Sequence, residues 1–184
     1  MNSTHAFADR LHEAQPGFRC ATLRVAYASA LLATAVVLGL IESSLPPIAV
    51  LPWLRIGLAN IAVVVALMLC GARVAALVSG GRVVVIGLLT GTIASPVFAM
   101  AAAGAALSLG VMVVLQRGLP SLSSVGLSAA GSVGHMFGQF LVAALVLGST
   151  SVFVLAPPSV LVALAVGAAT GLVAGGVVSR ITKR

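Results

Sequence analysis

The chain has 184 residues, of which 60% are hydrophobic and 7% are charged, and its mean hydropathy is +1.21. A soluble domain carries about 25% charged residues, so this composition excludes a soluble protein and indicates an integral membrane protein. The three acidic residues, Asp9, Glu13 and Glu42, form no cluster that could hold magnesium for phosphoryl or prenyl transfer, and we expect no metal site and no cofactor. The net charge is +7, but the basic residues stand singly at the ends of apolar segments, which favours a topology signal over nucleic-acid binding.

Six apolar segments, separated by loops that contain proline or glycine, predict an all-α bundle of six transmembrane helices. These helices are expected at about residues 25–43, 56–70, 74–94, 97–115, 124–147 and 159–178. The second predicted helix is short for a bilayer, so tilt or a few residues of the flanking loop must make up the missing length. The pattern predicts three parts, namely a cytoplasmic lead-in (1–24), a transmembrane domain (25–179) and a cytoplasmic tail (180–184).

The distribution of Arg and Lys predicts the orientation of the helices. An even number of spans places both termini on the same side of the membrane. With the termini in the cytoplasm, the inner segments hold eight basic residues, the outer loops hold Arg55 alone, and Arg82 lies within a span. This imbalance follows the positive-inside rule, so we expect both termini to lie on the cytoplasmic side of a plasma membrane.

Small residues recur every four positions on three of the predicted helices, and such faces let two helix backbones approach closely. The first span carries one of these faces near its start, so this face can dock closely on another helix. The faces are Ala26, Ala30 and Thr34 on the first span, Gly126, Ala130, Gly134 and Gly138 on the fifth, and Gly167, Gly171 and Gly175 on the sixth.

A polar stripe interrupts the apolar fifth span. His135 and Gln139 are four residues apart and therefore share one helix face, which Ser128 and Ser132 extend. In hydrocarbon such a stripe is costly unless it faces partners, water or a ligand. It is either a polar contact between two helices or one wall of a substrate site.

The predicted topology gathers the other polar residues in the outer half and the centre of the membrane, which describes a pocket that opens outward. Each member also has a simpler interpretation. Arg82 is placed to pair with Glu42, a lone Asn60 commonly bridges two helices, and Trp53 is a typical interface anchor. The candidate ligand-binding residues are Arg82, His135, Gln139, Asn60, Arg55, Glu42, Ser132 and Trp53.

Four segments resemble, in order, a bacterial membrane family called heptaprenyl diphosphate synthase component I, also named the Gx transporter family. These segments are ESSLPP, LPWLRIGLANIAVVVAL, GRVVVIGLLTGT and SSVGLSAAGSVGHMFGQFLVAALVL, and the resemblance covers roughly residues 25–147. The chain departs from the family pattern at Arg55, where members commonly have Lys, and at Met136, where they commonly have Asn. The family is similar to the substrate-binding S components of energy-coupling-factor transporters.

The two family names imply different functions. The S-component likeness implies a six-helix bundle that binds a small molecule from outside, docks on a scaffold membrane protein through the first helix, and depends on two cytoplasmic ATPases. The synthase name implies a non-catalytic membrane subunit of a polyprenyl diphosphate synthase or of an electron-transfer system. A third hypothesis, an intramembrane enzyme that uses His135 as an acid or base, has no nucleophile or carboxylate near that residue in the sequence. We expect transport without catalysis by this chain, and a ligand that is anionic or rich in hydrogen-bond acceptors.

Overall fold

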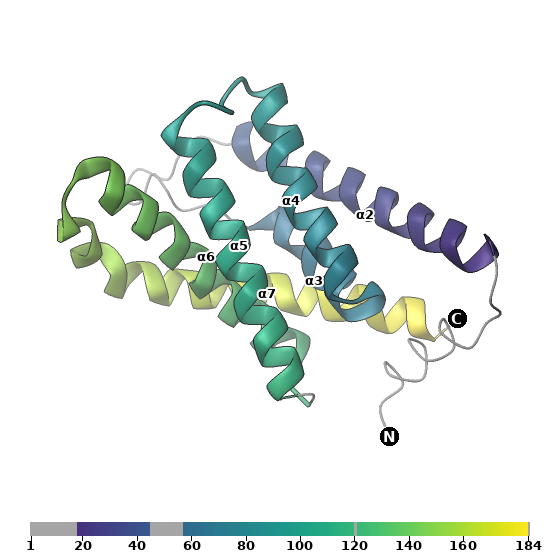
Figure 1. Ribbon diagram of the computed structural model, residues 1–184. Coiled ribbons are helices and arrows are strands. Elements are labelled where there is room, and N and C mark those ends of the chain that lie inside the picture. The colour runs from purple at the N-terminus through teal and green to yellow at the C-terminus, as the bar shows by residue number, and fades with distance from the viewer. Residues whose placement is uncertain (1–17, 45–56, 120, 184) are drawn as a thin grey trace.

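The computed structural model describes residues 18–44, 57–119 and 121–183, whose arrangement is shown in Figure 1. Over these residues the chain forms helices and no strand, which confirms the all-α fold class. The elements are α2 (Phe18–Ser44), α3 (Leu58–Cys70), α4 (Ala72–Leu89), α5 (Pro96–Gly118), α6 (Ser124–Leu147), the 3-10 helix η1 (Thr150–Leu155) and α7 (Ala156–Thr182).

Helix α6 coincides with the fifth predicted span, and local signals fix both of its ends. The Ser123 hydroxyl accepts a hydrogen bond from the backbone N–H of Gly126 at 3.2 Å, which satisfies one of the free donors of the first turn. At the other end Gly148 has a φ of 62°, the left-handed conformation that terminates helices and that glycine adopts without strain.

Helix α4 ends at Leu89, five residues before the expected end, so the prediction was wrong here. The reason is a glycine stop signal in the sequence LTGT. Gly91 has a φ of 68°, and the next N–H, of Thr92, donates to the Gly87 carbonyl at 2.8 Å. This pattern closes a helix and turns the chain away from its axis. Thr90 and Thr92 therefore belong to the end of the helix and the following loop.

Other boundaries also differ from the expected ones. Helix α2 begins at Phe18 and α5 continues to Gly118, so both are longer than the predicted spans. Helix α7 runs from Ala156 to Thr182, beyond the predicted span at both ends, and Pro157 and Pro158 lie inside its first turn. The sequence reading placed these prolines before the helix. A first turn needs no N–H from these positions, however, and the fixed φ of proline suits it.

The helices pack as two groups of three consecutive elements (Figure 1). In the first group α2, α3 and α4 contact one another, and in the second group α5 and α7 both pack extensively along α6. The groups meet where α3 contacts α7 and where α4 contacts α5. The beginning of α2 and the end of α7 lie at the same end of the bundle (Figure 1).

Glycines set the close packing of the second group. A Cβ atom added at Gly138 of α6 would lie 2.5 Å from the Ala103 carbonyl oxygen of α5. One added at Gly167 of α7 would lie 2.5 Å from the Cα atom of Ala129 on α6. Both distances are shorter than any real carbon contact, so the helix backbones touch directly at these points. The predicted packing role is confirmed for Gly134 and Gly138 of α6 and for Gly167 and Gly171 of α7.

Helix α3 forms the centre of the bundle. It has 13 residues and is thus about 20 Å long, whereas the hydrocarbon core is about 30 Å thick. Its apolar residues are almost fully buried and join side chains of the neighbouring helices in one core. The short second span expected from the sequence is therefore an enclosed helix whose neighbours, rather than lipid, cover its sides.

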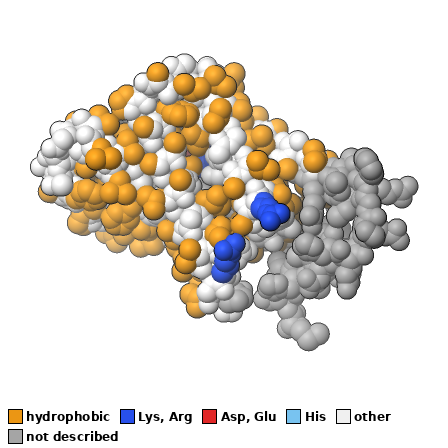
Figure 2. Space-filling model, viewed as in Figure 1, with side chains coloured by type: hydrophobic (Ala, Val, Ile, Leu, Met, Phe, Trp, Pro, Cys, Tyr) orange, Lys and Arg blue, Asp and Glu red, His pale blue; other side chains and the backbone are white. Residues whose placement is uncertain are grey.

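The outer surface of the bundle is apolar. Five helical segments are long and apolar enough to cross a membrane, and many large hydrophobic side chains on them are exposed. Figure 2 shows this surface, with the basic side chains of this face near the beginning of α4 and the end of α5. An apolar surface of this extent is expected against lipid tails, so the protein is a helical membrane bundle.

Candidate functional site

A cavity of about 310 Å³ lies between the two groups of helices. It is at the end of the bundle where α2 and α4 finish and where α3, α5 and α7 begin, and it reaches the middle of α6. The apolar core fills the opposite end of the bundle. Under the predicted orientation the cavity is at the outer side of the membrane, and the core closes it from the cytoplasm.

One wall of the cavity comes from α6 and is polar. Ser132, His135 and Gln139 all line it, which follows from their spacing of three and four residues on one helix. The predicted stripe is divided, however. Ser128 faces α7, where its hydroxyl lies 2.9 Å from that of Thr170 in a fully buried hydrogen bond. Ser128 thus connects two helices, while the other three residues face the cavity.

The imidazole of His135 lies flat against α5 at a glycine. A Cβ atom added at Gly104 would be 2.8 Å from Cε1, 2.9 Å from Nδ1 and 3.0 Å from Nε2 of the ring. The ring occupies the space that the side chain of any residue other than glycine at position 104 would fill. Gly104 therefore allows the imidazole to sit at the cavity wall, and nothing in the sequence connects these two residues in advance.

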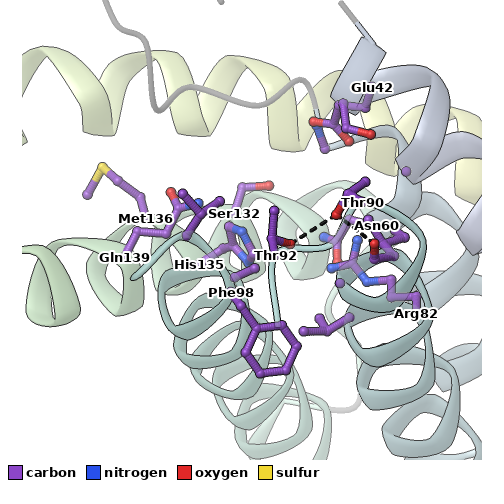
Figure 3. Close-up of a pocket in the computed structure, with 18 of the residues that line it drawn as sticks. Glu42, Asn60, Arg82, Thr90, Thr92, Phe98, Ser132, His135, Met136 and Gln139 are labelled. Atoms are coloured by element: carbon purple, nitrogen blue, oxygen red, sulfur yellow. Dashed lines mark hydrogen bonds between the residues drawn. The ribbon is translucent and has the colours of Figure 1, made fainter. Parts of the chain in front are cut away.

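The facing wall is formed by the ends of α2, α3 and α4 and carries Glu42, Asn60 and Arg82 (Figure 3). Glu42 is 9% exposed, and its Oε1 atom accepts a hydrogen bond from the backbone N–H of Gly57 at 2.6 Å. Gly57 precedes α3 with a φ of 71°, a left-handed conformation that only glycine adopts readily. The sequence expected Glu42 as a partner of Arg82, and the structure gives it this contact at the start of α3.

Two buried amides face the cavity from its opposite walls. Asn60 is 7% exposed and Gln139 is 8% exposed. Among the residues that the structure describes, no group hydrogen bonds to either side-chain amide, although each amide has two donor hydrogens and an acceptor oxygen. A bridge between helices, the simpler interpretation of Asn60, is thus not present in this part of the chain. Both amides line the cavity, so a bound molecule or water can form hydrogen bonds with them there.

Arg82 lies ten residues into α4, about 15 Å from its first residue, and its side chain lines the same cavity. Thr90 and Thr92 lie beside it at the end of this helix (Figure 3). The Thr90 hydroxyl donates to the Ile86 carbonyl at 2.7 Å, so the 2.9 Å contact between the two threonines has Thr92 as its donor. Neither threonine was among the candidate residues predicted from the sequence, although the glycine stop signal between them could have placed them at the helix end.

Most of the remaining described lining is apolar. Phe98 and Val97 from the start of α5, Ile86 from α4, and Met136 from α6 cover the space between the polar groups. Met136 is 5% exposed and packs with Phe140 and Ala163. A mostly apolar cavity with a few convergent polar groups is typical of a small-molecule site.

Two predicted sites remain to be placed. Trp53 and Arg55 lie outside the described residues. The predicted docking face on α2 is exposed at all three positions, and the Thr34 hydroxyl donates to the Ala30 carbonyl at 2.8 Å. Across residues 18–44, 57–119 and 121–183 no group of three or more His, Cys, Asp or Glu residues could hold a metal ion.

Comparison with protein families gives a match to heptaprenyl diphosphate synthase component I over residues 31–177. The match confirms the family resemblance and extends it beyond residue 147 into α7. Its description names a component of a synthase. No curated protein and no solved structure matches the chain, and the likeness to energy-coupling-factor S components stays a prediction. Because the match spans most of the chain, this protein belongs to the heptaprenyl diphosphate synthase component I family.

Proposed function

We propose that the chain is the substrate-binding membrane component of an importer for a small vitamin- or cofactor-like molecule. The observation that carries this proposal is the cavity, in which an Arg, a His, a buried carboxylate and two buried amides converge from four helices. Such groups are costly in a membrane interior and are retained where they bind something. The predicted orientation gives the ligand access from the outer side.

Transport into the cell then requires partners. The sequence has no nucleotide-binding motif, so energy from ATP must come from cytoplasmic ATPases through a scaffold membrane protein. The exposed small-residue face of α2 supports docking on such a scaffold, because small residues allow close approach of a second helix. On this proposal the chain binds and releases its ligand and performs no chemistry on it.

The family description favours a second candidate, a non-catalytic membrane subunit of a heptaprenyl diphosphate synthase. The lining of the cavity argues against a role in holding the product. Polar side chains from several helices converge on it, and an apolar heptaprenyl chain makes no use of them. The cavity suits a small polar molecule, in agreement with the first proposal.

The test compares Arg82→Gln with Arg73→Gln, which makes the same change on the same helix outside the cavity. Mass spectrometry of wild-type protein should detect a co-purifying small molecule. Arg82→Gln should retain less of it, while the melting temperature without ligand should change little. The expected loss of binding is about 1.5–3 kcal/mol, as for a hydrogen bond to a charged group. His135→Ala should behave in the same way.

The opposite result would identify a structural role for these residues. If Arg82→Gln and His135→Ala strongly lower the melting temperature while the remaining folded protein retains the small molecule normally, the cavity residues hold helices together and the binding proposal fails. Arg73→Gln should match wild type in both measurements.

A further inference from the structure

Glu42 brings a negative charge into a cavity that the sequence suggested was suited to anions. Its side chain is 9% exposed and lines the cavity together with Arg82. Among the residues that the structure describes, the cavity lining therefore holds one formal positive group and one formal negative group, and His135 lies on the facing wall. A purely anionic ligand would be attracted by the guanidinium and repelled by the carboxylate in the same low-dielectric space.

The Glu42 carboxylate has remaining capacity for hydrogen bonds. A carboxylate offers about four acceptor sites on its two oxygens. Among the described residues its one hydrogen-bond donor is the Gly57 N–H, which contacts Oε1. Because Glu42 lines the cavity, the remaining acceptor sites of its carboxylate are available to a hydrogen-bond donor or a cation bound there.

The two buried amides have the same mixed character. Asn60, on the wall that also carries Glu42 and Arg82, and Gln139, on the α6 wall, each offer donors and an acceptor to the cavity (Figure 3). An amide is matched by a group that itself both donates and accepts hydrogen bonds. Three helices thus present acceptors that a purely anionic molecule leaves unused.

We infer that the ligand is amphoteric: an ammonium or N–H group on it binds to Glu42, and an anionic or carbonyl group on it binds to Arg82. The inference rests on the proposed function and narrows the ligand class, from anionic molecules to small compounds that carry both a nitrogen donor and an acidic or carbonyl group. The apolar surface of Phe98 and Met136 accommodates the ring or chain between these two ends.

The experiment uses the purified full chain and a set of small probe molecules in three classes. The first class has a carboxylate and no N–H group, such as benzoate. The second has both, such as 4-aminobenzoate, and the third has an amine and no acidic or carbonyl group, such as aniline. Thermal shift and direct binding measurements rank the classes on wild type, on Glu42→Gln and on the control Arg73→Gln. The Gln side chain keeps the size of Glu42 and an oxygen for the Gly57 N–H.

The second class should bind tightest to wild type, and Glu42→Gln should weaken it by about tenfold or more, as for the loss of a hydrogen bond to a charged group. Binding of the first class should be unchanged or tighter in this variant, because a repulsive charge has been removed. The control should bind all classes as wild type does. If Glu42→Gln does not fold, the ranking of the classes on wild type decides the question alone.

Two results would overturn the inference and leave the proposed function standing. In the first, probes of the first class bind wild type as tightly as probes of the second class or more tightly, and Glu42→Gln does not change the affinity for either class. In the second, sodium chloride raises the melting temperature of wild type more than choline chloride does, and this difference disappears in Glu42→Gln. That result would mean that the carboxylate binds a metal cation. Failure of every class to bind, together with the absence of any co-purifying small molecule, would instead overturn the proposed function.

Discussion

Replacing Gly104 by Ala should displace the His135 imidazole without unfolding the protein. The added Cβ atom would lie 2.8 to 3.0 Å from three ring atoms, and ordinary carbon contacts are about 3.5–4.0 Å. The ring must therefore move by about 0.5–1 Å. It can do so because it is the end of a flexible side chain at the edge of a cavity.

The energetic consequences fall on binding more than on stability. An imidazole forced away from its preferred rotamer costs about 0.5–1.5 kcal/mol. The replacement of a helical glycine by alanine returns up to about 1 kcal/mol. The two terms nearly cancel, so the free energy of unfolding of Gly104→Ala should stay within about 1 kcal/mol of wild type. Ligand affinity should fall about tenfold, because a hydrogen bond to the displaced ring weakens.

The assay measures unfolding in detergent and the affinity for the tightest-binding probe, and Gly110→Ala is the matched control. Gly110 is on the same helix, and a Cβ atom there would meet nothing within 4 Å. This control should keep full affinity and gain slightly in stability. A double variant with His135→Ala tests the cause, because Gly104→Ala should then reduce affinity no further. An equal loss of affinity with and without the imidazole would refute the reasoning.

Two further predictions concern orientation and docking. A reporter fused after Arg117 should give a cytoplasmic signal, because the positive-inside rule places the end of α5 there, and a signal from the outer side would refute the topology. Ala30→Leu should abolish co-purification with a scaffold membrane protein and leave the melting temperature unchanged, because Ala30 is exposed and a large side chain separates closely packed helices. The control is Ala106→Leu on the exposed face of α5, which should co-purify normally, and equal co-purification of both variants would remove the reason for assigning the α2 face.

The sequence was informative wherever a single helix determined the outcome. The i, i+4 spacing of His135 and Gln139 fixed their common face, and the glycines of α6 and α7 indicated close packing before any coordinates. The depth argument placed Glu42 toward the outer face and Arg82 near the centre of the membrane, and both line the cavity. These properties follow from helix geometry and from the cost of polar groups in lipid, which a sequence carries directly.

The properties that depend on contacts between helices could not be predicted. Ser128 shares the helix face of the cavity residues by spacing, yet it is turned to Thr170, because the position of α7 decides which part of the stripe is covered. The contact of Gly104 with His135 joins two helices whose rotation no sequence pattern specifies. The hydrogen bond from Gly57 to Glu42 is similar, since it depends on how α3 begins beside the end of α2.

The division of the bundle into two groups of consecutive helices has a consequence for biogenesis. Each group is built mainly from contacts between neighbours in sequence, and the glycine contacts of α5, α6 and α7 need no part of the first group. Local contacts form early, because the chain segments that separate them are short. We expect each half to assemble as it leaves the insertion machinery. The cavity needs side chains from both halves and is then completed last. Ligand binding therefore requires that both halves are folded and packed against each other.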